Sequence, residues 1–333
     1  MPISEREKRG EGRHVPVLLN EILEIFNPRP GETYIDATVN GGGHAIAILE
    51  RVGAEGTVLG IDWDCGLIDQ LNAQRQKLNA KNLKLICANY VNLRSITREH
   101  NLDQVSGIIF DLGFSSYHPE KSGRGFSFRT DEPLDMRYHP VRSLARDGVA
   151  SPEDLGEATS NGVNTNEHDL TAEKIINTWK EEAIEAILRE FGEERFSGRI
   201  ARGIAEERRR KKISRTGELV RIIRQCVPAR NLTGRIHFAT RSFQALRIAV
   251  NNELENLKKA LEESMDILGD EGKIAVISFH SLEDRIVKNF FRDKAKGGKL
   301  KILTKKPVSP EDLEIKNNPR ARSAKLRAAV RII

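Results

Sequence analysis

The chain has 333 residues, 38% of them hydrophobic and 31% charged, with a mean hydropathy of −0.47 and a net charge of +6. This length predicts two domains or one domain with a large insertion, and the apolar content is enough to bury a core. No apolar stretch reaches the roughly 18 residues of a membrane helix. The N-terminus, expected to be a flexible tail over 1–12, is charged and has no apolar signal region. We therefore expect a cytoplasmic chain with no membrane partner.

The three cysteines, Cys65, Cys87 and Cys226, lie far apart in the sequence and form no Cys-x-x-Cys pair. This spacing argues against a disulfide framework and against a cysteine-based zinc site, and it fits a reducing compartment. No metal is expected.

Strands and helices alternate over the first part of the chain. A helix is predicted at 14–26, strands at 33–39, 56–62, 83–90 and 105–113, and further helices at 44–52 and 65–78. This alternation predicts βαβ units and a doubly wound, mostly parallel sheet, which is a Rossmann-like α/β domain.

The pattern changes in the middle of the chain. A Gly-, Ser- and Pro-rich loop and a polar stretch at 143–170 are followed by amphipathic helices at 181–191 and 216–226. We expect an inserted helical substrate-recognition domain, with a basic outer surface, over 121–235.

The remaining α/β domain is then discontinuous, over 13–120 and 236–333. Apolar residues from Leu246 to Leu268 form one stripe of a single long helix that Gly269 is expected to end. Further elements are predicted as a strand at 273–279, a helix at 281–291, and strands at 300–306 and 325–333 that form an antiparallel edge.

A glycine-rich turn follows the first strand. Gly41, Gly42 and Gly43 lead into a helix, an arrangement that brings backbone N–H groups close to a nucleotide-type cofactor. Asn40 precedes them, and asparagine tolerates a left-handed φ better than most residues. A tight turn without a ligand is the alternative for the glycines alone.

Acidic residues at the ends of later strands favour cofactor binding over a turn without a ligand. Asp62 lies nineteen positions after Gly43, where a Rossmann site has the acid that binds a ribose hydroxyl. Asp64 is an alternative helix N-cap at this point. Ligands in such sheets bind outside the carboxyl ends of the strands, so Asp111 and Tyr90 are expected at the same crevice.

Several longer strings resemble one family. They are HVPVLLNEIL, YIDATVNGGGHA, IIFDLGFSS, RGFSFRTDEPLDMR, GEERFSGRIARGI, ATRSFQALRIAVNNEL, SFHSLEDRIVKNFF and NPRARSAKLR, in order along nearly the whole chain. Together they resemble the small-subunit rRNA cytosine-N4 methyltransferase family. The resemblance implies a class I (Rossmann-like) methyltransferase with an inserted helical domain, S-adenosyl-L-methionine as cofactor, and a cytosine in the decoding region of 16S rRNA as substrate.

The resemblance also implies a set of cofactor contacts. By motif these are Gly42, Gly43, His44, Asp62, Tyr90, Asp111 and His118. Two positions depart from the family pattern, since Asn40 replaces a glycine and His118 replaces a glutamine or another polar residue. The stretch 143–170 is also longer and more polar than the family leads us to expect.

The chemistry of methyl transfer requires alignment and a proton acceptor. The N4 amine of cytosine is a poor nucleophile, and Asp111 or a backbone carbonyl of 112–116 is placed to accept its hydrogen. A purely cofactor-binding role for Asp111 is the alternative. His280 and Glu283 suggest catalysis as well, but we favour a structural histidine at a strand–helix junction with Ser281 as the N-cap.

The RNA contacts are expected to be basic and aromatic. Arg124, Arg129, Arg320, Arg322 and the run 208–212 are candidates for phosphate contacts. Phe126 and Phe128 are candidates for stacking on an unpaired base. Core packing or a solvated surface is the alternative for each.

Partners and rival functions follow from these residues. The expected partner is 16S rRNA or the small ribosomal subunit, and a homodimer is left open. The first rival function is a nicotinamide-dependent oxidoreductase, which would need a fuller G-x-G-x-x-G loop and a catalytic Tyr/Lys or His pair. The second is a non-catalytic RNA-binding assembly factor, against which the strand-end acids Asp62 and Asp111 argue.

Overall fold

The computed structural model describes residues 16–77, 79–102, 104–113, 122–139, 170–234 and 236–332. The chain forms two compact units, one made of Met1–Ser115 and Leu254–Ile333 and the other of Ser116–Glu253. The inserted unit thus ends at Glu253, whereas the sequence placed its end at 235. The expected tail at 1–12, His118 and the stretch 143–169 lie outside the described residues.

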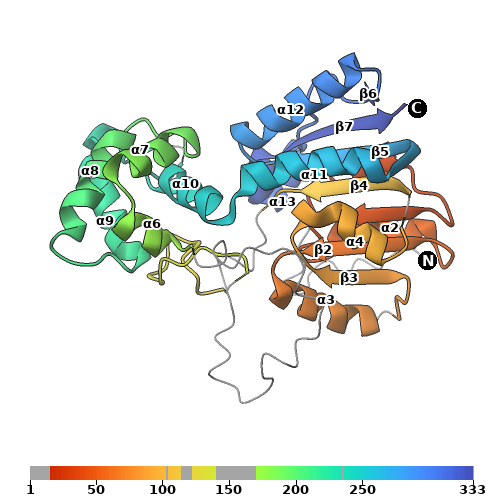
Figure 1. The fold of residues 1–333 in the computed structure, drawn as a ribbon, viewed down its shortest axis with the longest axis horizontal. Coiled ribbons are helices and arrows are strands. Elements are labelled where there is room, and N and C mark those ends of the chain that lie inside the picture. The colour runs from red at the N-terminus through yellow and green to blue at the C-terminus, as the bar shows by residue number, and fades with distance from the viewer. Residues whose placement is uncertain are drawn as a thin grey trace. The chain divides into compact units, whose positions relative to one another are not determined.

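The first unit is built on a sheet of seven strands in the order β3-β2-β1-β4-β5-β7-β6 (Figure 1). The strands are β1 (Thr33–Asp36), β2 (Thr57–Asp62), β3 (Leu83–Cys87), β4 (Val105–Asp111), β5 (Leu268–Ser278), β6 (Leu300–Ile302) and β7 (Lys325–Arg331). Strands β1 to β5 pair in parallel, whereas β7 runs antiparallel to both β5 and β6. The predicted mostly parallel sheet and its antiparallel edge are confirmed.

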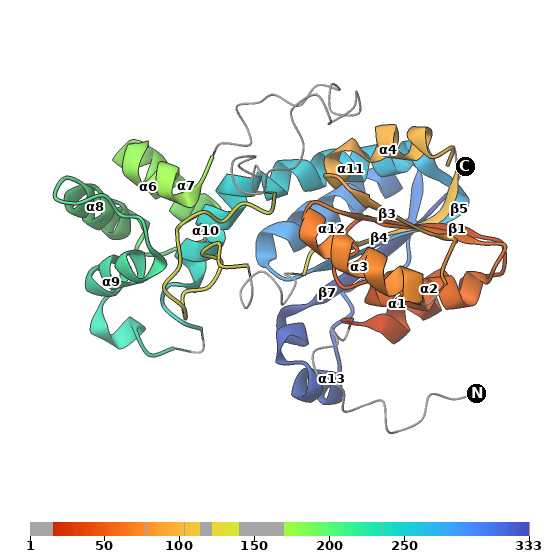
Figure 2. The same ribbon diagram turned by 90° about the horizontal axis from the view of Figure 1, so that it is seen from below.

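Helices cover both faces of this sheet. They are α1 (Leu19–Phe26), α2 (Gly43–Val52), α3 (Cys65–Lys77), α4 (Leu93–Glu99), α11 (Glu253–Ile267) and α12 (Ser281–Lys296). The unit also contains a short helix, α13 (Asp312–Asn317), and 3-10 helices at Tyr90–Asn92 and Pro319–Ser323. Figure 2 shows α1, α2 and α3 on one side of the strands and α4 and α11 on the other. This is the doubly wound arrangement that alternating strands and helices predict.

The alternating direction of side chains along the strands explains why helices cover both faces of the sheet. Tyr34 and Ile109 pack in the core under α1, α2 and α3, while their neighbours Ile35 and Ile108 pack in the core under α4, α11 and α12. All four side chains are at most 1% exposed. Because successive side chains of a strand point to opposite faces, a strand that is apolar at every position needs a helical layer on each side.

The second unit is helical. It contains α6 (Ala172–Thr178), α7 (Glu181–Glu190), α8 (Ser197–Arg208), α9 (Thr216–Cys226), a 3-10 turn at Ala229–Asn231, and α10 (Thr240–Asn251). The helices predicted at 181–191 and 216–226 are therefore confirmed. In the part of the chain that the structure describes, no helix of either unit is long and apolar enough to cross a membrane.

The single long helix predicted from Leu246 to Leu268 is wrong. It is two helices, α10 and α11, separated at Asn252, whose backbone is left-handed with φ 50° and ψ 36°. The Asn251 side chain stabilises the break, since its Nδ2 donates to the carbonyl of Met136 at 2.8 Å and its Oδ1 accepts from the amide of Tyr138 at 2.9 Å. The apolar spacing continues across the break, so periodicity alone gives no sign of it.

The expected end of that helix is also wrong. The second helix stops at Ile267, and Gly269 lies inside β5, which begins at Leu268. This strand extends five residues further toward the N-terminus than the predicted start at 273, because Leu268 pairs with Val105 of β4. Strand pairing, which depends on a distant segment, overrides the local signal of the glycine.

Candidate functional site

The glycine turn between β1 and α2 requires glycine for two reasons. Asn40 has φ 48° and Gly42 has φ 79°, so the expected left-handed backbone at Asn40 is confirmed. A Cβ added to Gly42 would lie 2.6 Å from Cδ1 of Leu71, and one added to Gly43 would lie 2.9 Å from the Pro16 ring. Side chains at these positions would therefore collide with the packing beneath the turn, in addition to straining Gly42.

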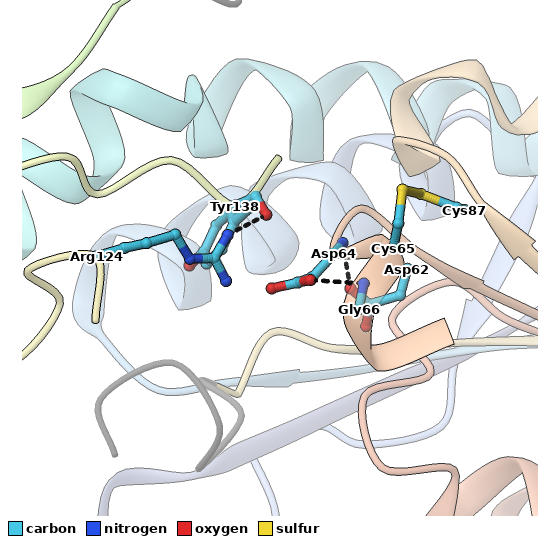
Figure 3. The surroundings of a disulfide bond; sticks show 7 residues. All are labelled: Asp62, Asp64, Cys65, Gly66, Cys87, Arg124 and Tyr138. Carbon is cyan, nitrogen blue, oxygen red and sulfur yellow. Dashed lines mark hydrogen bonds between the residues drawn. A yellow bond between two sulfur atoms is a disulfide. The ribbon is translucent and has the colours of Figure 1, made fainter. Parts of the chain in front are cut away.

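Asp62 fastens this turn to the end of β2. Its Oδ2 accepts a hydrogen bond from the backbone amide of Asn40 at 2.9 Å, and its Oδ1 accepts one from the amide of Asp64 at 2.9 Å. Asp64 in turn accepts from the amide of Gly66 at 3.0 Å, at the start of α3 (Figure 3). The helix-capping role proposed for this region thus falls to Asp64, and Asp62 faces the glycine turn.

Asp36 is a residue that sequence reasoning did not select. It ends β1, is 1% exposed, and its Oδ1 accepts from the amide of Thr38 at 3.2 Å. Its Oδ2 has no hydrogen-bond partner among the described residues. Burial, followed by the nearby charge of Asp111, raises the pKa of Asp36 to about 8. The available signal was its position, because it ends a strand just as Asp62 and Asp111 do.

Asp111 is also buried, with 4% exposed. Its Oδ1 accepts from the amide of Gly113 at 3.0 Å, and its own amide donates to Oγ1 of Thr38 at 2.6 Å. The Asn40 side chain donates to the Asp111 carbonyl at 3.4 Å. Thr38 and Asn40, from the turn after β1, thus tie the end of β4 to the glycine turn.

His44 lies beside this acid on the first turn of α2. Its Nε2 lies 2.9 Å from the carbonyl of Val17, which only accepts, so Nε2 carries the hydrogen. Its Nδ1 lies 3.7 Å from Oδ2 of Asp111. His44 is 4% exposed, and the hydrogen bond to Val17 holds its ring with Nδ1 facing Asp111.

Tyr90 lies beyond the end of β3, which stops at Cys87 rather than extending to residue 90. Its ring meets Phe110 edge-on, with centroids 5.8 Å apart and planes at 87°. It therefore packs on the sheet as a half-buried rim aromatic, next to the strand ends that bear Asp62 and Asp111. His118 lies outside the described residues, so its predicted contact stays a prediction.

The expectation of no disulfide is wrong. Cys65 and Cys87 form a disulfide with their Cα atoms 5.0 Å apart, while Cys226 is a free thiol (Figure 3). Twenty-two residues separate the bonded pair in sequence, but Asp62 is in register with Cys87 in the parallel pairing of β2 and β3. Cys65, three residues after Asp62, therefore begins α3 beside the end of β3, which sequence spacing does not reveal.

His280 and Glu283 have the structural role that we favoured, with one correction. His280 itself is the N-cap of α12, because its Nδ1 accepts from the amide of Glu283 at 3.4 Å, so Ser281 is not the cap. Glu283 returns the contact by accepting from the amides of Phe279 at 2.8 Å and His280 at 3.2 Å. This reciprocal arrangement is a capping box.

The candidate RNA-binding residues of the second unit differ in their surroundings. Arg124 donates to the carbonyls of Arg137 at 2.9 Å and Tyr138 at 2.7 Å, so its guanidinium holds its own loop. Phe126 is buried at 8% exposed. Phe128 instead stacks on the exposed ring of His237 with centroids 4.4 Å apart. Arg129 is exposed.

The basic run 208–212 is partly neutralised. Arg208 donates to the carbonyl of Ile176 at 2.7 Å, Lys211 pairs with Glu218 at 2.6 Å and Lys212 pairs with Glu173 at 2.7 Å. Arg209 and Arg210 are exposed. In the first unit, Arg320 and Arg322 are exposed on the 3-10 helix at Pro319–Ser323.

The fold and the site define a class. A doubly wound sheet whose strand order reverses between β1 and β4, with a glycine turn and acids at the strand ends, is a Rossmann-like cofactor-binding protein. Residues 11–151 and 164–332 match the model of the MraW methylase family. The chain belongs to this family.

Named relatives cover nearly the whole chain. It is 42% identical over 335 residues to a ribosomal RNA small subunit methyltransferase H of Heliobacterium modesticaldum, covering 96% of this chain and 98% of the relative. The corresponding protein of Dictyoglomus thermophilum is 43% identical over 322 residues, covering 96% and 97%. An rRNA methylase structure from Streptococcus thermophilus aligns with 10% identity and a TM-score of 0.43, covering 96% of this chain and all of that one.

The family is a methylase family, and this membership supports S-adenosylmethionine as the cofactor. Two features of the structure fit that ligand. The glycine turn admits close backbone approach at Gly42 and Gly43, and the buried Oδ2 of Asp36 is an unpaired acceptor within the same group of strand ends. A cofactor that bears a positive charge suits a group of strand ends that carries the acids Asp36, Asp62 and Asp111.

Proposed function

We propose that this protein transfers a methyl group from S-adenosylmethionine to N4 of a cytosine in the decoding region of 16S rRNA. Family membership and the names of its relatives support an rRNA methyltransferase. The structural observation that carries the proposal is the hydrogen bond from the Asn40 amide to Asp62, which joins the glycine turn to the strand-end acid. The resemblance of the sequence motifs to the cytosine-N4 methyltransferase family supports N4 of a cytosine as the methylated atom.

The cofactor contacts follow from this arrangement. We propose that Asp62 holds the ribose hydroxyls and Tyr90 flanks the adenine, while the turn residues Gly42, Gly43 and His44, with Asp111 and His118, complete the site. When bound, S-adenosylmethionine supplies a sulfonium methyl group that is open to in-line attack. The protein then has to align the acceptor amine and exclude water.

Asp111 is our candidate for the proton acceptor. Its Oδ1 already accepts from the amide of Gly113 at 3.0 Å, so Oδ2 is the oxygen available to an amine hydrogen. An acceptor there localises the nitrogen lone pair, which makes the cytosine amine a better nucleophile. The alternative, in which Asp111 serves the cofactor alone, places the acceptor on a backbone carbonyl of the loop after β4.

Nucleoside mass spectrometry of 16S rRNA tests the proposed function. Cells that lack the gene are expected to lose N4-methylcytidine from the small-subunit rRNA, and a plasmid copy is expected to restore it. The matched control is a plasmid copy with Asp62→Ala, which should be expressed without restoring the modified nucleoside. Unchanged N4-methylcytidine in the deletion strain would exclude the proposal and favour a non-catalytic assembly factor.

Arg320 and Arg322 are expected to contact phosphates because both are exposed cations on one short helix. Replacing both with alanine should reduce the slope of log affinity for rRNA against log salt by about 1.5 to 2, as expected for two lost phosphate contacts. Filter binding at several salt concentrations measures this slope. The matched control removes the same charge from exposed Lys296 and Lys299 of α12 and the turn after it, and an equal effect of the two pairs would contradict the assignment.

A nicotinamide-dependent oxidoreductase is not favoured. Its G-x-G-x-x-G loop is absent from the sequence, where Asn40 precedes three consecutive glycines. The family that the chain belongs to transfers methyl groups. Titration with NADH and with S-adenosylhomocysteine distinguishes the two, because only the second is expected to bind.

A further inference from the structure

Three carboxyl groups meet where the strand order of the sheet reverses. In the parallel pairing, Asp36 is in register with Gly60 of β2 and Ile109 of β4, each two residues before the acid that ends its strand. Neighbouring strands lie about 4.8 Å apart, so the carboxyl groups of Asp36, Asp62 and Asp111 share one small region. The central one, Asp36, is the group that nothing so far has assigned a role.

Asp36 has few contacts that favour its charged form. The acids acting on it from the neighbouring strands are Asp111 and Asp62, and both oppose its ionisation. The backbone amides of Thr38 and Ala45, the latter at the start of α2, offset part of this effect. The imidazole on that same turn, His44, faces Asp111. Among the described residues, the largest influences on the pKa of Asp36 include no lysine or arginine.

The second carboxyl oxygen of Asp36, Oδ2, is buried without a hydrogen-bond partner among the described residues. The residue as a whole is 1% exposed. A buried carboxylate with an unpaired oxygen is costly, whereas a neutral carboxylic acid at the same place is much less so. In the free protein, burial and Asp111 accordingly raise the pKa of this group to about 8, so it is protonated at pH 7.

The cofactor changes its charge during the reaction. S-adenosylmethionine has a positive sulfonium, and S-adenosylhomocysteine has a neutral thioether in its place. A positive charge close to a carboxyl group favours ionisation, and its loss restores the neutral form. We propose that Asp36 senses this charge, giving up its proton when S-adenosylmethionine binds and regaining one when the sulfonium becomes a thioether. This inference rests on the proposed placement of the cofactor at these strand ends.

The charges and protons of the reaction balance on this basis. The amine lone pair forms the N–C bond, the C–S bond breaks with its electron pair left on sulfur, and the amine releases one proton. The site thereby loses one positive charge. Asp111 accepts the released proton first, and Asp36, ionised beside the sulfonium, takes it up from there as the positive charge disappears. The overall reaction of the loaded protein therefore releases no net proton until the product leaves and a new cofactor binds.

The inference predicts different pH dependences for cofactor and product. Below about pH 8, S-adenosylmethionine has to displace the proton of Asp36, so its dissociation constant should fall by up to about tenfold for each pH unit gained. Above that pH the carboxyl group is already ionised, and the affinity should level off. S-adenosylhomocysteine leaves the proton in place, so its affinity should not follow this titration.

Isothermal titration calorimetry tests the inference directly. Each ligand is titrated into the protein at pH 7 in phosphate and in Tris buffer, whose ionisation enthalpies differ, so that the difference in heat counts the protons exchanged. Wild type should release about one proton more with S-adenosylmethionine than with S-adenosylhomocysteine. Asp36→Asn, which cannot titrate, should abolish that difference. The matched control, Asp270→Asn, removes an exposed acid on β5 and should retain it.

The outcomes separate this inference from the proposed function. If neither ligand binds wild type, the cofactor site itself is wrong. If both bind with equal proton exchange, or if Asp36→Asn keeps the wild-type difference, Asp36 is not the sensor. Should Asp36→Asn fail to fold, Asp111→Asn serves instead, because removing the neighbouring anion should move the midpoint of proton release to lower pH. An unmoved midpoint would overturn the inference.

Discussion

Replacing Asp62 with alanine is expected to weaken the binding of S-adenosylmethionine by about 100-fold or more. Both carboxylate oxygens accept backbone amides, Oδ2 from Asn40 and Oδ1 from Asp64, each at 2.9 Å. The substitution therefore removes the proposed ribose contact and also releases the glycine turn from β2. Hydrogen bonds from the two ribose hydroxyls to a charged carboxylate are worth about 1.5 to 3 kcal/mol each, so losing both corresponds to at least two orders of magnitude in affinity.

Calorimetry with purified protein measures this loss, and Asp64→Asn is its matched control. Asp64 lies two residues away and is 5% exposed, but its Oδ1 accepts from the amide of Gly66 at the start of α3. Asparagine serves this position as well as aspartate does, so the affinity should change little. Binding by Asp62→Ala that equals wild type would show that the glycine turn is not held through this acid.

Replacing Gly42 with alanine should cost both stability and cofactor affinity. Its φ of 79° is unfavourable for a residue with a side chain, and the added Cβ would lie 2.6 Å from Cδ1 of the buried Leu71. The backbone effect is worth about 1 kcal/mol and overpacking about 1 to 3 kcal/mol, so we expect the free energy of unfolding to fall by about 2 to 4 kcal/mol. The turn should also move away from the position that the cofactor needs.

Gly298→Ala is a matched comparison because it has a positive φ without the collision. Gly298 follows α12 with φ 68°, and an added Cβ would have no atom within 4 Å. The Lys299 amide donates to the Lys294 carbonyl at 3.0 Å, as in a helix that ends on a left-handed residue. Denaturant unfolding should report a loss near 1 kcal/mol for this variant, with unchanged cofactor affinity. The double variant Gly42→Ala/Leu71→Ala should recover part of the packing cost. Equal losses for Gly42→Ala and Gly298→Ala would contradict the steric explanation.

Local patterns in the sequence determined much of this protein. The strands at 33–36, 57–62 and 105–111 and the helices at 181–190 and 216–226 each follow from a short apolar period with a nearby break. The spacing along the chain predicted that Asp62 lies close to the glycine turn. The hydrogen bond from the Asn40 amide to Asp62 shows that the two are in contact. These features depend on residues that lie close together in the sequence or on the Rossmann-like topology.

Only the tertiary structure decided the features that depend on distant partners. The Cys65–Cys87 disulfide exists because parallel pairing brings the start of α3 beside the end of β3. The break at Asn252 is stabilised by bonds from Asn251 to backbone groups of a loop more than a hundred residues earlier in the chain. The capping role of His280 likewise depends on the tertiary structure, because the sequence is equally compatible with Ser281 as the N-cap of α12.

Asp36 illustrates the distinction most clearly. Its position at the end of β1 is visible in the sequence, but its protonation state is not, because that depends on complete burial and on Asp111, seventy-five residues further along the chain. Sequence alone determined the family, the order of the elements and which acids end the strands. The tertiary structure decided which of those acids is desolvated and faces another, because electrostatic energies depend on distance and dielectric surroundings, which a linear pattern does not contain.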